Sequence, residues 1–382
     1  MRILIATVTA GGGHLAAAAA LDEAWRAVRP QDVVEQIDLV QFFSPLHRKI
    51  HAAGYVKLVA RAPELWGLIF SKTDDPDVAR RLNRIQRLFP GHSRRRFLRY
   101  VRQFKADVVL CTHYEPLSPL AGLKRARGTS AFKPFVASVV TDFEAHALWM
   151  SAGVDLYCVA AAETKARLVA RGATAEDVVV TGIPIAAKFA TKLDARSVRK
   201  ALGLRDDLPT LLVLSGGFGM GPVGKILGQL DKVARELQTV VVCGRNEELR
   251  RELAAQDHQH PTRVLGFASN MQELMAVADL IITKPGGLTT SEALALGKPL
   301  LILDPIPGQE AANSDFLLER GAAAKVNRVE DLPFKLEQLL TSKKLVALAN
   351  AARALGQPQA AKEICQQVVN RWQNFGRPDG VI

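Results

Sequence analysis

Short apolar runs alternate with stretches of helical periodicity along almost the whole chain. The first run, residues 2–8, is followed by a glycine-rich turn, and residues 15–28 are alanine-rich and helical. A buried strand, a turn and a helix in this order predict the opening unit of a parallel α/β fold. The same pattern predicts further strands at residues 33–39, 107–111, 135–140, 156–159, 178–181, 210–214, 239–243, 263–266, 278–282 and 299–303.

The second half of the chain restarts this pattern. Residues 210–214 lead into SGGFG at residues 215–219, and a helix is predicted over residues 222–237. The preceding residues 188–209 are polar and helical without a strong apolar stripe. A chain of 382 residues usually forms two domains, so we expect two similar α/β halves with a boundary near this polar segment.

The pattern marks the other elements unevenly. Residues 80–105 predict a helix with a break at Pro90 and Gly91, and residues 342–373 predict two helices. Residues 41–78 hold three prolines and an aromatic cluster, and no regular element is predicted there.

Composition narrows the class of protein. Hydrophobic residues make up 48% and charged residues 23% of the chain, as in soluble globular proteins. Four cysteines without a CxxC pair argue against a zinc site or a disulfide framework and favour a reducing compartment. The first apolar run lacks a basic leader, so it predicts a strand and not a signal peptide, and no run is long enough to predict a membrane span.

Nearly all of the net charge of +12 lies in residues 48–105, which hold fifteen Lys and Arg against four Asp and Glu. The stretch ends in basic residues that recur with apolar ones at helical spacing, which indicates either a solvated helix face or attraction to an anionic surface. Large apolar residues at 66–70 indicate either core or insertion at a bilayer interface. Because the two features coincide, we expect contact with a membrane through Trp66, Phe70, Arg94, Arg95, Arg96 and Arg99.

His14 follows three consecutive glycines and begins the first predicted helix. The positive end of a helix disfavours an imidazolium, so the pKa of His14 is expected to be lowered and the neutral ring to suit a general base. The alternative is a plain cap residue. His113, Asp142 and His146 also follow predicted strands, and ligand sites in parallel sheets gather at such strand ends.

A second candidate site begins at Lys284, where KPGGLTTSE follows an apolar run. Hydroxyls and free N–H groups at a helix N-terminus favour a diphosphate, and Glu292 is placed to accept from sugar hydroxyls. A capped helix with an acidic first turn is the alternative. Amide and carboxylate groups at residues 309–313 suit a hexose, whose hydroxyls need paired donors and acceptors.

Five motifs in this order carry a resemblance to a known family: TAGGGH at residues 9–14, TDF at 141–143 with His146, SGGFG at 215–219, KPGG at 284–287 with Glu292, and PGQE at 307–310 with Asn313. The chain resembles the monogalactosyldiacylglycerol synthase family, which includes bacterial diacylglycerol glucosyltransferases and is related more distantly to the peptidoglycan glycosyltransferase MurG. The resemblance implies the α/β fold called GT-B, in which two Rossmann-like domains face a central cleft. It covers essentially the whole chain.

The resemblance also implies an enzyme that transfers glucose or galactose from a UDP-sugar to diacylglycerol, with inversion to a β-glycoside. Phe267 and Ala268 would contact the uracil and Glu292 the ribose, and Gln309 and Glu310 would read the sugar. No cofactor or metal beyond the donor is implied. The full implied donor set is Gly12, Gly13, Ser215, Gly216, Gly217, Arg245, Phe267, Ala268, Lys284, Gly286, Gly287, Leu288, Thr289, Glu292, Gln309, Glu310 and Asn313.

On the acceptor side, the resemblance implies that His14 or Asp142 removes the proton from the acceptor hydroxyl, with His146 in the same cleft. We prefer His14, because its place at a helix end independently favours a neutral ring. The expected location is the cytoplasmic face of the cell membrane, as a peripheral protein. The compact length favours glucose over galactose.

The expected domains are an acceptor-binding domain at residues 1–190, a donor-binding domain at 191–355, and a C-terminal helix at 356–382 that packs back on the first domain. The alternatives are a UDP-N-acetylglucosamine-dependent transferase with another lipid acceptor, as in MurG, and a nucleotide-sugar epimerase. A nucleic-acid partner is not expected, because it leaves the five motifs unexplained.

Overall fold

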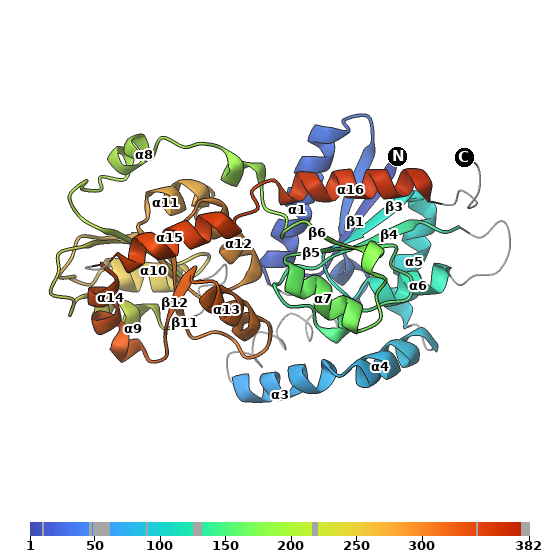
Figure 1. Ribbon diagram of the computed structural model, residues 1–382, viewed down its shortest axis with the longest axis horizontal. Helices are drawn as coiled ribbons and strands as arrows, with labels where there is room; N and C mark the ends of the chain where they lie inside the picture. Colours follow the sequence, from blue (N-terminus) through green and yellow to red (C-terminus); the bar gives the residue numbers. More distant parts are fainter. Residues whose placement is uncertain are drawn as a thin grey trace. The chain divides into compact units, whose positions relative to one another are not determined.

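The computed structural model describes residues 1–9, 11–45, 48, 62–88, 91–124, 132–215, 221–340 and 343–375. The chain divides into two compact units. The first unit comprises Met1–Ala187, Pro307–Gln309 and Gln359–Ile382, and the second comprises Lys188–Ile306 and Glu310–Pro358. Figure 1 labels the elements of both units.

The first unit is built on a six-stranded sheet of order β2-β1-β3-β4-β5-β6, in which all neighbouring strands pair in parallel. Its strands are β1 (Arg2–Thr7), β2 (Val33–Asp38), β3 (Val108–Cys111), β4 (Phe135–Val139), β5 (Leu156–Val159) and β6 (Val178–Val180). Its helices are α1 (Gly13–Val28), α3 (Pro63–Thr73), α4 (Pro76–Leu88), α5 (His92–Phe104), α6 (Leu117–Lys124), α7 (Ala162–Ala170) and α16 (Ala360–Asn374), with short 3-10 helices η1 (Leu39–Phe42), η2 (Ala147–Trp149), η3 (Ala175–Asp177) and η4 (Ala187–Ala190).

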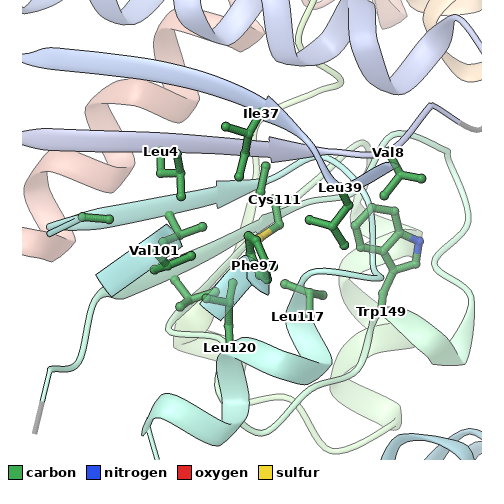
Figure 2. Close-up of a cluster of buried hydrophobic side chains, with 14 of the residues drawn as sticks. Leu4, Val8, Ile37, Leu39, Phe97, Val101, Cys111, Leu117, Leu120 and Trp149 are labelled. Carbon is green, nitrogen blue, oxygen red and sulfur yellow. The ribbon is translucent and has the colours of Figure 1, made fainter. Parts of the chain in front are cut away.

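The strands contribute side chains to two hydrophobic cores, one on each face of this sheet. Leu4 and Ala6 of β1 point to the face covered by α5 and α6, where Phe97, Val101 and Leu120 are buried (Figure 2). Ile3 and Ile5 of the same strand point to the face covered by α1 and α16. The buried runs that the sequence shows are therefore explained by burial on both faces.

The last helix packs on the first one, although most of the chain separates them. Ile364, Cys365 and Val368 of α16 lie in the same buried cluster as Leu21 and Trp25 of α1, and α16 crosses α1 in Figure 1. The C-terminal segment therefore completes the core of the first unit.

The second unit repeats the architecture with a parallel sheet of order β12-β11-β10-β7-β8-β9. Its strands are β7 (Thr210–Leu214), β8 (Gln238–Val242), β9 (Thr262–Leu265), β10 (Leu280–Thr283), β11 (Leu300–Leu303) and β12 (Ala323–Val326). Its helices are α8 (Ala195–Ala201), α9 (Val223–Leu230), α10 (Glu247–Ala254), α11 (Met271–Val277), α12 (Gly287–Ala295), α13 (Gln309–Glu319), α14 (Leu332–Leu340) and α15 (Lys344–Leu355), with the 3-10 helix η5 (Val329–Asp331).

Two local predictions from the sequence are wrong. The segment predicted to be irregular contains α3, which Pro63 opens at a position where its missing N–H costs nothing. The helix predicted over residues 222–237 ends at Leu230, because tight turns from Lys232 to Gln229 and from Val233 to Leu230 replace the helical hydrogen bonds. The predicted strands and the two C-terminal helices are confirmed within a few residues, whereas β12 was not predicted.

None of the helices in the described part of the chain combines the length with the apolar composition that crossing a bilayer requires.

Candidate functional site

Three neighbouring strands of the first unit bring three of the candidate site residues together. His14 follows β1, His113 follows β3 and Asp142 follows β4, and these strands are adjacent in the sheet. All three side chains line a cavity of about 320 Å³. The strand ends of a parallel sheet meet at one edge, so this convergence follows from topology.

Two hydrogen bonds fix the tautomer of His14. Its Nδ1 lies 2.8 Å from the carbonyl oxygen of Thr112 and 3.0 Å from Oγ1 of Thr141. A carbonyl oxygen only accepts, so the proton of the neutral ring is on Nδ1. Nε2 is then the basic nitrogen of a ring that lines the cavity.

The pKa of His14 is lowered from its ordinary value, in the expected direction but for a different main reason. Burial of the ring is the largest cause, where the sequence suggested the helix end. The nearby charges of Asp142 and Glu115 and the Thr112 carbonyl oppose the shift, because each favours the imidazolium. The ring is therefore neutral at pH 7 and has anionic groups nearby that would stabilise it after it takes a proton.

Aromatic rings form one wall of the cavity. His113 meets the His14 ring edge-on, with centroids 4.7 Å apart, and stacks on Tyr114 at 4.3 Å. Tyr114 in turn meets Trp149 edge-on at 6.1 Å. With Ile69, Phe70 and Leu148 also lining it, the cavity is apolar around a few polar groups, which suits an amphiphilic ligand.

His146 lines the same cavity but is engaged differently. Its Nδ1 accepts the backbone N–H of Leu148 at 3.1 Å, and its Nε2 lies 3.0 Å from the carbonyl oxygen of Phe70 and 3.3 Å from Thr73 Oγ1. Both ring nitrogens are thus occupied by contacts within the unit. Burial lowers the pKa of His146, so the ring stays neutral. This geometry favours a positioning role for His146 over proton transfer.

The apolar side chains of α3 that are most exposed are not the two that we named from the sequence, Trp66 and Phe70. Trp66 and Phe70 are half-buried and line the cavity. The exposed large apolar residues are Leu65, Leu68 and Ile69, with 50%, 52% and 40% of their surface accessible. A continuous apolar face of this kind on one helix indicates a site of interaction.

The basic residues of α5 are divided between solvent and the interior. Arg95, Arg96 and Arg99 are exposed, whereas Arg94 is half-buried near Glu115. Attraction to an anionic surface requires basic side chains that are accessible to solvent, and these three arginines are. Phe97 and Val101 of the same helix are fully buried. This burial also agrees with the alternative interpretation, in which α5 packs through its apolar residues and its basic face is only solvated.

In the second unit, neighbouring strands bring the predicted Ser215 and Lys284 to one edge of the sheet, together with Asp304. Ser215 follows β7, Lys284 follows β10, and Asp304 follows β11. Lys284 Nζ pairs with Asp304 at 3.1 Å, and the Ser215 hydroxyl donates to the carbonyl oxygen of Val242 at 2.8 Å. The predicted Gly216 and Gly217 lie outside the described residues.

The helix α12 begins where the sequence places the diphosphate site. Gly286 is its N-cap and has no side chain to cap it, so the first N–H groups are available to a ligand. Gly287, Leu288 and Thr289 form its first turn. Glu292 stands one turn further along the helix, and burial raises the pKa of its carboxyl to about 7 while Lys188 opposes the shift.

The other predicted donor residues lie on three elements of the chain. Arg245 packs over the ring of Phe267 at 5.5 Å, with Ala268 next in the chain, and Phe267 is 65% exposed. Glu310 accepts the backbone N–H of Ile306 at 2.8 Å. Asn313 is fully buried, and its amide donates to the carbonyl oxygen of Pro285 at 3.0 Å, so it holds the loop before α12 in place.

Three of the predicted residues stand apart from these groups. Gln309 begins α13 but is grouped with the first unit. Gly12 is the N-cap of α1 and Gly13 its first residue, and a Cβ built on Gly12 would meet no atom within 4 Å. The turn before α1 therefore has open space beside its backbone.

No group of three or more His, Cys, Asp or Glu side chains that could hold a metal ion occurs among the residues that the structure describes.

The sequence assigned no role to Thr112, Thr141 or Glu115, although Thr141 opens the TDF motif. The first two fix the tautomer of His14, and the third lines the cavity and acts on the His14 charge. Their position directly after β3 and β4 was the available signal, since His113 and Asp142 were chosen on that ground.

Two family models match the chain. The model of monogalactosyldiacylglycerol (MGDG) synthase matches residues 14–185, and that of the glycosyltransferase family 28 C-terminal domain matches residues 214–368. A curated relative is the processive diacylglycerol beta-glucosyltransferase of Bacillus pumilus, which is 30% identical over 97% of this chain and 95% of its own length.

Solved structures share the fold. MurG of Acinetobacter baumannii aligns with a TM-score of 0.62 over 97% of this chain and 99% of its own, at 18% identity. Anabaena Alr3699/HepE in complex with UDP-glucose aligns with a TM-score of 0.54 over 98% and 100%, at 14% identity. The two parallel sheets thus form an α/β architecture of the GT-B kind.

The tautomer of His14 can be tested directly. At pH 6.5 we expect a neutral ring with its proton on Nδ1, since burial lowers the pKa of His14 and Nδ1 donates to Thr112. Long-range ¹H–¹⁵N correlation spectra from pH 5 to pH 8 report both the tautomer and the charge, and His14→Gln identifies the signal. A His14 ring still half-protonated above pH 6.5, or one with its proton on Nε2, would contradict this assignment.

Proposed function

This chain belongs to the family of monogalactosyldiacylglycerol synthases and diacylglycerol glucosyltransferases, within glycosyltransferase family 28, and from that premise we propose that it transfers a hexose from a UDP-sugar to diacylglycerol. It is a glycosyltransferase. Glucose is the donor sugar that we propose, because the curated relatives of 30% to 32% identity are named beta-glucosyltransferases.

One observation carries the mechanism: Nδ1 of His14 lies 2.8 Å from the carbonyl oxygen of Thr112, so the proton of the neutral ring is assigned to Nδ1, and the ring lines an apolar cavity. In the proposed reaction, Nε2 of His14 takes the proton of the acceptor hydroxyl. The acceptor oxygen forms the new bond to the anomeric carbon, the bond from that carbon to the diphosphate breaks, and UDP leaves with the electron pair. A single displacement of this kind converts an α-linked donor into a β-glycoside.

The charges around His14 support this division of labour. Asp142 and Glu115 act on its ring electrostatically, so each favours the imidazolium that forms as the proton moves. Asp142 is therefore proposed to stabilise the charged ring, with His14 as the base. His146, whose nitrogens are occupied, is proposed to shape the acceptor site.

The donor would lie in the second unit. The first turn of α12 offers N–H groups to the diphosphate, with Lys284 nearby as a cation, and Glu292 would accept from the ribose hydroxyls. Phe267 offers an exposed ring on which a uracil can stack, and Arg245 packs on that ring. Glu310, whose carboxylate lies about 4.0 Å from where a Cβ on Gly286 would stand, is near the place where the sugar would emerge.

The acceptor would reach the cavity from a membrane surface. Ile69 both lines the cavity and is exposed beside Leu65 and Leu68, so the apolar lining continues onto the outward face of α3. A lipid could pass along such a path with its acyl chains out of water. We propose peripheral association with the cytoplasmic face of the membrane through this face, assisted by Arg95, Arg96 and Arg99 on anionic lipids.

The test of the function is turnover on diacylglycerol in mixed micelles, with UDP-glucose, UDP-galactose and UDP-N-acetylglucosamine compared in parallel. A glycosyl diacylglycerol is the expected product, with UDP-glucose the best donor. Absence of any glycolipid with all three donors, or epimerisation of UDP-N-acetylglucosamine, would refute the proposal. Products with two or more sugars would show that this chain is also processive.

Replacing His14 tests the base. His14→Ala is expected to lower kcat by about 10² to 10⁴, because a general base contributes that much, while the affinity for UDP-glucose changes little. Steady-state kinetics and calorimetry measure the two quantities, and His92→Ala, at an exposed residue, is the control. Near-normal turnover of His14→Ala, together with loss in Asp142→Asn, would transfer the base role to Asp142.

Glu292 should make donor binding depend on pH. Its carboxyl has a raised pKa of about 7, so it is mostly protonated at pH 6 and mostly ionised at pH 8, and the ionised form accepts two hydroxyls better. UDP-glucose, which has no group of its own that titrates in this range, should bind about tenfold more tightly at pH 8 than at pH 6. Calorimetry should show weaker and pH-independent binding for Glu292→Gln. If the affinity for UDP-glucose changes with pH equally in the unmodified protein and in Glu292→Gln, Glu292 is not part of the donor site.

The outward face of α3 should govern membrane binding. Leu68→Glu is expected to reduce partitioning onto vesicles about tenfold or more, since a leucine side chain that leaves water contributes about 1.5–3 kcal/mol. Co-sedimentation with anionic vesicles measures it. Val346→Glu, at a residue 63% exposed on α15, is the matched control. Equal binding of the two variants would exclude this face of α3.

A further inference from the structure

Helix α3 has two different faces and no buried residue. Trp66, Ile69, Phe70 and Thr73, spaced at one helical turn, line the cavity that contains His14. Leu65 and Leu68 point outward with half of their surface accessible. Because none of its apolar side chains is fully buried, hydrophobic packing stabilises the position of α3 less than that of a core helix, and polar contacts have a large share in fixing it.

Asp74, the C-cap of α3, makes several of these contacts. Its Oδ1 accepts the backbone N–H of Ala147 at 2.8 Å. Its Oδ2 accepts from the guanidinium of Arg171 at 2.8 Å, and Arg167 lies 3.6 Å away. One carboxylate thus joins the end of α3 to η2 and to the end of α7, across 73 to 97 residues of sequence.

Arg171 extends the connection into the loop that carries Asp142. Its second guanidinium nitrogen donates to the carbonyl oxygen of Ala145 at 2.7 Å, and its side chain is only 11% exposed. His146 is the next residue in this loop, and its Nε2 lies 3.0 Å from the carbonyl oxygen of Phe70 in α3. The loop after β4 and the cavity-lining end of α3 are therefore tied to each other from both sides.

We propose that Asp74 is a positioning residue for the acceptor, which acts through Arg171 and the loop after β4 to hold α3 against the cavity. The inference rests on the proposed function, since it assigns the cavity wall formed by α3 to the lipid acceptor. Asp74 itself does not line the cavity, so its effect is exerted through Phe70 and Thr73, which do. Nothing in this role requires a change in donor binding.

Asp74→Asn removes the charge but retains the shape, leaving the guanidinium of Arg171 without its carboxylate. We expect kcat/KM for diacylglycerol in vesicles to fall about 10- to 100-fold, the range that a small misplacement of substrate causes. The dissociation constant for UDP-glucose should stay within about twofold, and the pH dependence set by His14 should not move. Asp77→Asn is the matched control, because Asp77 lies three residues further on, is exposed, and pairs with Arg80 on the surface.

A second measurement does not depend on activity. Hydrogen exchange of the backbone amides of residues 64–74, measured by mass spectrometry, should be faster in Asp74→Asn than in Asp77→Asn and the unmodified protein. Arg171→Met, which breaks the joint from the other side, should give the same increase.

The outcomes separate the two proposals. A protein that glycosylates no diacylglycerol refutes the proposed function, whatever the exchange rates are. If Asp74→Asn keeps the kcat/KM of the unmodified protein for diacylglycerol and its hydrogen exchange in residues 64–74 is unchanged, the positioning role is overturned but the proposed function is not. A parallel loss of UDP-glucose affinity would also overturn it, because it would show general damage to the fold.

Discussion

The hydrogen bond from Nδ1 of His14 to the carbonyl oxygen of Thr112 is the contact on which the proposed chemistry depends. It joins the start of α1 to the end of β3, and Thr112 returns a hydroxyl bond to the carbonyl oxygen of His14 at 3.1 Å. The pair fixes the ring at the strand edge and places its proton. Without it, either nitrogen could carry the proton, and a ring protonated on Nε2 has no base on that side.

Burial is the physical effect that recurs at both candidate sites, with opposite consequences for charge. It lowers the pKa of His14 and raises that of Glu292, so both groups are pushed towards their neutral forms. For His14 the neutral form is the reactive one. For Glu292 the neutral form is the weaker acceptor, so a ligand that binds the carboxylate must drive its ionisation. The proposed dependence of donor binding on pH follows from this difference.

The acceptor side combines a polar frame with an apolar lining. Asp74, Arg171 and His146 use charge and hydrogen bonds to fix the end of α3, while Trp66, Phe70 and Trp149 supply the apolar wall. A lipid with a single hydroxyl group needs such a site, because its acyl chains are held by apolar surface and its hydroxyl must be placed beside a base. The exposed Leu65 and Leu68 extend this surface outward.

The sequence by itself determined the α/β class, the succession of strands and helices along the chain and the glycine-rich turns, because apolar runs and turn residues are local signals. It also indicated His14 and Glu292, since each follows a turn at a helix start. Only the tertiary structure decided the rest. The tautomer of His14 depends on Thr112, 98 residues away, and the outward face of α3 depends on which side of that helix the cavity occupies. Both His146 and Asp74 have partners more than seventy residues distant, and no local pattern reveals a contact that only the packing of separate elements creates.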